Sequence, residues 1–205
     1  MSPTARRSEP TTRRPRASSA SQQLEWLLLV YKVPVEPSKI RVGIWRELKR
    51  LGALYLQQAV ALVPNRPDVA EAVTAVRQRI TDLGGTSHFF EIPPLPADQE
   101  ETLVRGFRDL ATKEYAEIVE ECETKFIKEI EFERFRGNYT FEEAEEIRQD
   151  LDKIRRWLDK VIARDWFEAP GRDEVADWLK RCEQELDAFE DDVFEKTGGQ
   201  DTQDQ

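Results

Sequence analysis

The stretch "WLLLVYKVP", residues 26–34, decides the fold of this chain. It begins with a short apolar run, continues with Tyr31 and Lys32, and ends at Pro34. The run is far shorter than the roughly 18 apolar residues of a membrane span. Because it is also too apolar to face water on all sides, we expect a buried strand that the proline terminates. A base, Lys32, therefore stands at the exit of this strand.

A first helix and an interrupted strand follow. Pro37 and Ser38 begin the helix, whose apolar residues recur at spacings of three and four, and Gly52 ends it. Residues 53–64 alternate as in a strand, but Gln57–Gln58 place a polar centre in it. Such a centre predicts a bend or bulge, so this segment forms either two short strands or one long bent strand.

A second helix and a last strand complete the N-terminal half. A stripe of valine, isoleucine and leucine runs through residues 66–85, which end in two glycines, and residues 86–92 again resemble a strand. The order β-α-β-(β)-α-β predicts an α+β domain over residues 23–96 of the ferredoxin-like βαββαβ type. Its two helices should cover one face of a small sheet.

The second half, residues 97–196, shows only helical patterns. Breaks at residues 136–140 and 169–172 divide it into about three helices, and Thr140 and Glu143 form a capping box before the second. Short connections favour antiparallel packing. The apolar stripes of these helices can close on each other, on the sheet domain or on a second subunit, and the sequence leaves this choice open.

Charge and the chain ends restrict the function. The formal net charge is −10, so the whole molecule repels nucleic acid and anionic membranes, and any site for DNA or an oxyanion must be a local basic patch. Residues 1–22 are rich in Arg, Ser, Thr and Pro, which predicts a disordered basic tail, and residues 197–205 predict a second disordered tail. The start of the chain lacks the apolar region of an export signal, so we expect a cytoplasmic protein without a membrane partner.

Motifs for catalysis are missing from the sequence. Cys122 and Cys182 occupy apolar positions of predicted helices and are expected to be reduced core residues. With a single histidine and no CxxC pair, we expect no zinc or di-iron site. There is no nucleophile motif and no phosphate-binding loop, so we expect neither an enzyme nor a cofactor.

Two groups of basic residues are the candidate binding sites. The first, the N-terminal basic set, can contact the phosphates of DNA or simply balance the acidic helices. Its members are Lys39, Arg41, Arg46, Lys49 and Arg50. The second, the C-terminal basic set, can bind an oxyanion or form ion pairs within the chain. Its members are Arg155, Arg156, Lys160 and Arg164.

The N-terminal half resembles the ChrB N-terminal family, which occurs in bacterial chromate-resistance proteins. The similar stretch is "EWLLLVYKVPVEPSKIRVGIWRELKRLGALYLQQAVALVPN", residues 25–65. The matching residues are Pro34, Pro37, Arg41, Val42, Trp45, Arg46, Leu48, Leu51, Gly52 and Ala53, with the strand end at Leu62–Pro64.

The helical half is similar to the same family. Its stretch "FIKEIEFERFRGNYTFEEAEEIRQDLDKIRRWLDKVIARDWFEAP", residues 126–170, ends in a fairly specific signature, so the resemblance covers residues 24–195. It implies a cytoplasmic chromate-responsive transcriptional regulator or a regulatory module of one. Longer family members add a C-terminal module, which implies a stand-alone version here or a separate ChrB C-terminal-like protein as partner.

A weaker resemblance links the first strand to the Cas2-like domains and the middle domain of phenylacetate-type repressors. Tyr31, Pro34, Gln57 and Val60 match, but Lys32 stands where those nucleases hold a metal-binding aspartate. Because metal-dependent hydrolysis requires that carboxylate, the residue argues against a nuclease. The remaining alternative to a DNA-binding regulator is a protein–protein adaptor, for instance a homodimer.

Overall fold

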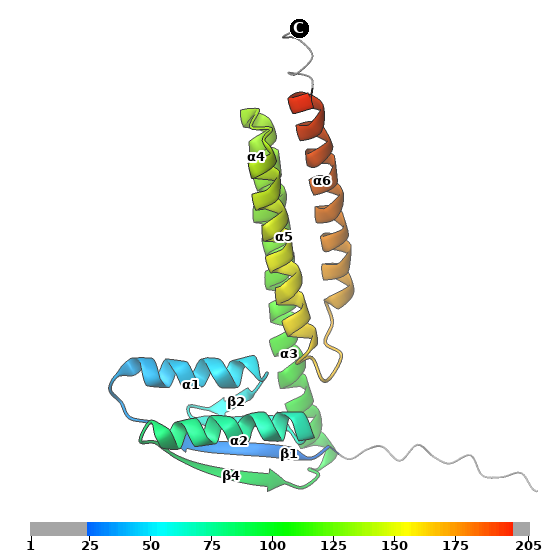
Figure 1. Cartoon of the computed structure of the whole chain (residues 1–205). Coiled ribbons are helices and arrows are strands. Elements are labelled where there is room, and N and C mark those ends of the chain that lie inside the picture. The colour runs from blue at the N-terminus through cyan, green and yellow to red at the C-terminus, as the bar shows by residue number, and fades with distance from the viewer. Residues whose placement is uncertain (1–23, 199–205) are drawn as a thin grey trace, which may run out of the picture.

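The structure is a computed structural model that describes residues 24–198. The basic tail expected over residues 1–22 and residues 199–205 of the expected C-terminal tail lie outside the described residues. The described chain is an α+β protein, and Figure 1 shows its two parts as the arms of an L. One arm holds the sheet with two helices, and the other is a bundle of long helices.

Within residues 24–198, four antiparallel strands form one sheet with the order β2-β3-β1-β4. Its strands are β1 (Trp26–Lys32), β2 (Leu54–Gln57), β3 (Val60–Pro64) and β4 (Thr86–Ile92). The opening stretch therefore supplies an interior strand, flanked by β3 and β4. The polar centre at Gln57–Gln58 produces two short strands, with a register shift at Tyr55/Gln57 and a left-handed residue, Ala59, in the turn. The sequence had left this choice open.

Helices α1 (Ser38–Arg50) and α2 (Pro67–Asp82) pack on one face of this sheet (Figure 1). Leu27 and Leu29 of β1 contribute to this core together with Ile44 of α1 and Ile80 of α2, all almost fully buried. Gly52 ends α1 with φ +68°, a conformation that L side chains adopt only with strain.

The longest helical segment runs without a break from α3 (Ala97–Glu121) through a π-helical turn, η1 (Cys122–Phe126), into α4 (Ile127–Arg136). At 1.5 Å per residue it spans roughly 60 Å. The sequence predicts one helix over this region but not the π turn, because apolar spacing does not reveal one extra residue within a turn.

Two further helices complete the bundle: α5 (Phe141–Ile162) and α6 (Arg172–Gly198). Thr140 caps α5, since its side chain accepts a hydrogen bond from the Glu143 backbone N–H at 3.1 Å. In a complete capping box the Glu143 carboxylate would accept a hydrogen bond from the Thr140 backbone N–H. Here it accepts a hydrogen bond from the Asn138 side-chain amide at 3.0 Å instead. Helix α6 continues two residues beyond the expected end at residue 196.

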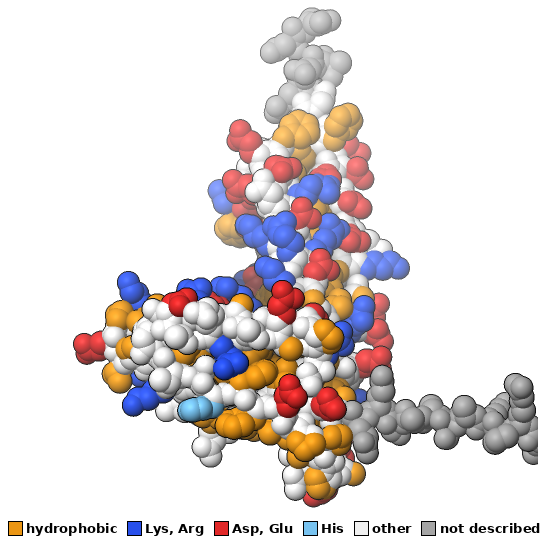
Figure 2. Space-filling view, turned by 60° about the horizontal axis from the view of Figure 1, so that its bottom comes forward, with side chains coloured by type: hydrophobic (Ala, Val, Ile, Leu, Met, Phe, Trp, Pro, Cys, Tyr) orange, Lys and Arg blue, Asp and Glu red, His pale blue; other side chains and the backbone are white. Residues whose placement is uncertain are grey.

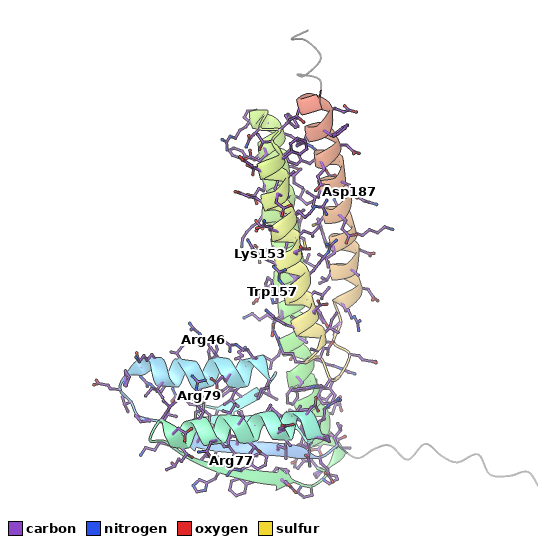
Figure 3. The ribbon with its side chains drawn as sticks, in the orientation of Figure 1. Arg46, Arg77, Arg79, Lys153, Trp157 and Asp187 are labelled. Carbon is purple, nitrogen blue, oxygen red and sulfur yellow. The ribbon has the colours of Figure 1, made fainter. Side chains whose placement is uncertain are left out.

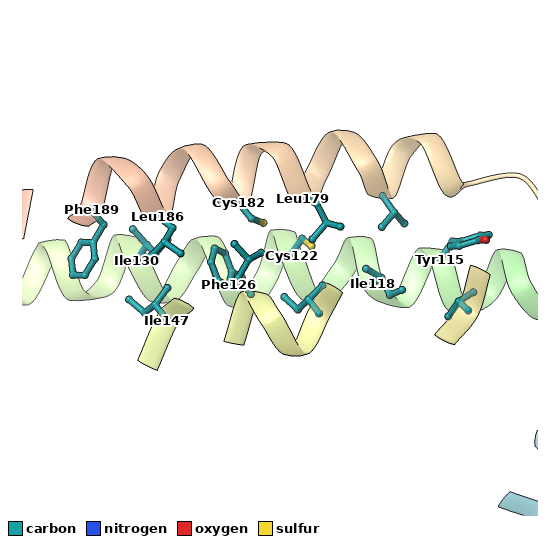
Figure 4. Close-up of a cluster of buried hydrophobic side chains, with 14 of the residues drawn as sticks. Tyr115, Ile118, Cys122, Phe126, Ile130, Ile147, Leu179, Cys182, Leu186 and Phe189 are labelled. Carbon is teal, nitrogen blue, oxygen red and sulfur yellow. The ribbon is translucent and has the colours of Figure 1, made fainter. Parts of the chain in front are cut away.

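The apolar stripes of these helices close on each other, which answers a question that the sequence leaves open. Figure 4 shows side chains of α3, α5 and α6 meeting along the bundle axis. Phe189 and Leu186 of α6 are almost fully buried against Ile130 of α4. Cys122 and Cys182 are free and buried in the same core, as predicted, and their thiols contact one another.

Aromatic rings join the two arms. Trp26 of β1 stacks on Phe107 of α3 with ring centres 5.5 Å apart. Phe167 and Trp166, which follow α5, lie 5.4 and 5.7 Å from the same phenylalanine ring. The four rings come from three segments that are far apart in the sequence, and the other three rings all contact Phe107, so Phe107 is the centre of the junction.

Candidate nucleic-acid interface

The N-terminal basic set lies on the solvent side of α1. Ile44 and Leu48 turn toward the sheet and are buried, so the remaining sides of this helix face outward. Four members of the set are exposed, and Lys49 is half-buried. Figure 3 shows Arg46 on the outer side of α1, away from the sheet.

The charge of this surface is not compensated within the described chain. Glu47 is the single acid of α1, and its carboxylate binds Arg79 of α2 at 2.5 Å. Across residues 24–198, no member of the N-terminal basic set forms an ion pair within 4.0 Å. Five positive charges therefore stand together on a molecule whose net charge is −10.

An apolar strip runs among these cations. Trp45 is 46% exposed and Val42 is 41% exposed, although both are large apolar residues. The Lys49 ammonium lies 5.7 Å from the centre of the Trp45 ring. An exposed aromatic ring beside cations is suited to contact a nucleic acid or to join a protein interface. The surface of α1 is thus both basic and apolar.

The structure separates the C-terminal basic set into different environments. Arg155 turns to α6 and pairs with Glu183, whereas Arg164 turns to α3 and pairs with Glu114. Arg156 and Lys160 are exposed and have no ion pair among residues 24–198. Arg155 and Arg164 thus form ion pairs within the chain, which is one of the two roles that the sequence leaves open for this set. An oxyanion would have to displace a carboxylate to bind either arginine.

Lys32 lies exposed at the end of β1, where the sequence comparison with nucleases placed it. The strand is interior, so its last side chain stands at one end of the sheet. No group of three or more His, Cys, Asp or Glu residues within the described part is arranged to hold a metal ion. The described part likewise contains no helix that is both long and apolar enough to cross a membrane.

Two features were missed from the sequence. Arg79 neutralises Glu47 from another helix, and no local pattern reveals that contact because the two residues lie far apart in the chain. Glu133 is 5% exposed, although the sequence places it among solvated acids. Its carboxylate accepts hydrogen bonds from Asn138 at 2.6 Å and Arg136 at 3.2 Å. The stretch "RGN", residues 136–138, ends helix α4 three residues after Glu133. This helix end is the sequence signal that could have suggested the contacts of the Glu133 carboxylate.

Fold and surface together define an α+β protein with a helical bundle arm and a basic helix on its sheet arm. Residues 41–200 match the family described as Protein ChrB, N-terminal. The chain belongs to this family, which confirms the resemblance seen in its sequence. The match includes every member of the N-terminal basic set except Lys39.

One relative shows how far the similarity extends. The chain is 27% identical over 161 residues to Protein ChrB of Cupriavidus metallidurans, which covers 78% of this chain and 46% of that protein. This chain therefore spans about half the length of the relative that it matches. No solved structure matches the chain.

Proposed function

We propose that this chain is a regulatory module of chromate resistance that binds DNA through the N-terminal basic set. Chromate enters the proposal through membership of the ChrB N-terminal family, and DNA enters through the surface of α1. The observation that carries the proposal is the group of five cations without ion pairs in the described chain, with the exposed Trp45 among them.

Electrostatics favours this surface over the rest of the molecule. A protein with net charge −10 is repelled by DNA at long range, so binding requires a patch where positive charge is not neutralised locally. Each phosphate contact by Lys or Arg releases counterions, and the affinity then falls steeply with salt. Figure 1 shows the bundle rising on the side of the sheet that α1 and α2 cover, so a duplex on α1 would lie beside the bundle.

The proposal is tested by titrating the full chain with labelled DNA from its own promoter and measuring fluorescence anisotropy. We expect affinity at about 50 mM salt that falls steeply by about 200 mM. Arg46→Gln should weaken binding and reduce the slope of log K against log salt by about 1. Absence of binding at the lower salt concentration would overturn direct DNA recognition.

A matched control comes from α6. The Arg181 guanidinium lies 4.2 Å from the Trp178 ring centre, so it is also an exposed cation beside a tryptophan. It stands on the acidic bundle rather than on the basic helix. Arg181→Gln should leave the affinity and its salt slope unchanged. An equal loss in both variants would show that binding is a diffuse charge effect and not a property of α1.

A protein–protein adaptor is the second candidate function. Exposed aromatic side chains on the bundle favour it, since Phe135 is 87% exposed and Phe194 is 70% exposed. The partner proposed for them is a separate protein that resembles the part of Protein ChrB outside the matched segment. Light scattering of a mixture of the two purified proteins tests this. If the double variant Phe135→Ser/Phe194→Ser still forms the complex, these two side chains are not part of the binding surface.

The finer features of the fold and site belong to the same proposal. We assign the sheet arm to the ferredoxin-like type, and its support is the antiparallel order β4-β1-β3-β2 with α1 and α2 on one face. We propose no catalytic role, since Lys32 occupies the position where a Cas2-like nuclease holds an acid. A cytoplasmic location, the C-terminal basic set as an oxyanion site and the absence of a cofactor remain predictions from the sequence.

A further inference from the structure

The face of the sheet opposite α1 and α2 is apolar and partly uncovered. Phe89 of β4 lies under Arg77 of α2, so its neighbours His88 and Phe90 point to the opposite face. On that face Phe90 is paired with Leu28 of β1 in the register of the two strands. We call this side of the sheet the open face.

Helix α3 covers only one end of the open face. Trp26 and Leu62 are buried against Phe107 there. Phe90 on the edge strand β4 is 49% exposed, and Leu56 on the opposite edge strand β2 is 46% exposed. Figure 2, in which the bottom of the molecule comes forward, shows hydrophobic side chains gathered along this lower part of the sheet arm. Large exposed apolar residues on one face are typical of an interaction surface.

A hollow lies where the open face meets the start of α3. Its volume is about 410 Å³. Its walls are mainly apolar: Leu28, Leu56, Leu62, Ile92, Leu95 and Leu103. Asp98, Gln99 and Thr102 of α3 provide its polar rim. The surface therefore combines a projecting aromatic residue, Phe90, with an apolar recess beside it.

The two ends of the open face carry opposite charges. Lys32 ends β1 at the end far from α3, opposite Thr86 of β4. Asp98 stands in the first turn of α3, close to the other end of the strand. Both side chains are exposed, and neither has an ion pair within residues 24–198.

We propose that the open face binds a second copy of this chain in an isologous dimer. A two-fold axis that lies between the two faces, parallel to the sheet and perpendicular to β1, turns one end of the face onto the other, which brings Lys32 of each copy to Asp98 of its mate. The same operation places the apolar open face of one copy, with Phe90 on its edge strand, against the apolar open face of the other. The charges at the two ends of the face are thus self-complementary, as an isologous interface requires.

Other occupants fit the open face less well. Residues 1–22 are rich in Arg, Ser and Thr and have few apolar side chains to fill an apolar recess. DNA is disfavoured because Lys32 is the one fixed cation that the sheet residues place on this face, and Asp98 repels phosphate. A second copy supplies both an apolar surface and the opposite charge.

The dimer is tested by sedimentation velocity of the full chain between about 1 and 100 µM, a range in which a specific dimer should form. We expect the wild type to dimerise and Phe90→Asp to remain a monomer with an unchanged far-UV circular dichroism spectrum. Phe132→Asp is the matched control, because Phe132 is 53% exposed on the bundle and should not affect association. A wild type that stays monomeric throughout, or a dimer that persists in Phe90→Asp, overturns the proposal.

The register of the dimer is tested by exchanging charges. Lys32→Asp alone and Asp98→Lys alone should each weaken dimerisation by about tenfold, because each places like charges together twice. The double variant Lys32→Asp/Asp98→Lys should restore the wild-type dissociation constant. No recovery in the double variant overturns the pairing. DNA affinity is measured separately and reports on α1, which covers the opposite face of the sheet.

Discussion

Two glycines of the sheet arm differ in the space around them. A Cβ atom added to Gly85 would lie 2.5 Å from the Lys32 carbonyl oxygen and 2.8 Å from Cγ2 of Ile80. Gly43, in the middle of α1, has no heavy atom within 4 Å of its added Cβ. At Gly85 the backbone of β1 approaches the end of α2, and only a residue without a side chain fits.

We therefore expect opposite effects from the same substitution. Gly85→Ala should lower the free energy of unfolding by about 1–3 kcal/mol, since a backbone must move to admit the methyl group. Gly43→Ala should raise it by about 0.5–1 kcal/mol, because alanine is the better helix former. Urea unfolding followed by circular dichroism measures both. Equal stability of the two variants would contradict the contact at Gly85.

Tyr115 links a buried hydroxyl to the loop after α5. Its side chain is 1% exposed, and its hydroxyl donates a hydrogen bond to Asp165 at 3.0 Å. Burial, followed by this hydrogen bond, raises the pKa of Tyr115 to about 12. An unfolded tyrosine loses its proton near pH 10. Between these values the folded state therefore binds more protons than the unfolded state.

This difference in proton binding makes stability depend on pH. As pH rises from about 10 to 12, the wild type should lose stability through Tyr115, because the unfolded chain ionises first. Tyr115→Phe lacks the hydrogen bond and should be less stable by about 1 kcal/mol at pH 7. Urea unfolding at both ends of this range should show that its deficit shrinks at high pH. A deficit that grows with pH would contradict the raised pKa.

At the scale of the elements, two breaks in the helical pattern, at residues 136–140 and 169–172, separate the helices that then pack against each other in the bundle. The capping threonine of α5, the glycine that ends α1 and the antiparallel bundle all agree with predictions from residue spacing. The π turn does not, because it depends on how α3 must shift to keep its stripe against α5 and α6. The junction of the arms is likewise a tertiary feature, since its rings come from β1, α3 and the segment after α5.

Phe107 is the residue on which that junction depends most. It is 6% exposed and contacts Trp26, Trp166 and Phe167. Phe107→Ala should cost about 3–5 kcal/mol of unfolding free energy, as expected for a buried phenylalanine. Because the rings connect two arms, we also expect unfolding by heat to separate into two transitions in calorimetry.

A control for this variant lies on the outer side of the bundle. Phe135→Ala removes the same side chain at an exposed position and should change stability by less than about 0.5 kcal/mol. A single sharp transition for Phe107→Ala, with a cost as small as that of the control, would show that other contacts hold the arms together.

At the scale of the whole molecule, charge is distributed unevenly. Arginines of α4 and α5 pair with acids of α6: Arg134 with Glu185 at 2.9 Å, and Arg148 with Glu190. The bundle thus neutralises many of its own cations. Helix α1 has a single acid, which Arg79 occupies, so its cations remain available to a partner. The proposed DNA surface and the proposed dimer face then lie on opposite sides of one sheet, and each can act without blocking the other.

The sequence by itself determined the kinds and order of the elements, because apolar spacing, prolines and glycines act over a few residues. It also determined the family and placed Lys32 at the end of the first strand. Only the tertiary structure decided which cations are free, which acids are buried and which side of the sheet stays open. These depend on contacts between residues far apart in the chain, such as Arg79 with Glu47 and Arg164 with Glu114, and spacing along one helix carries no information about them.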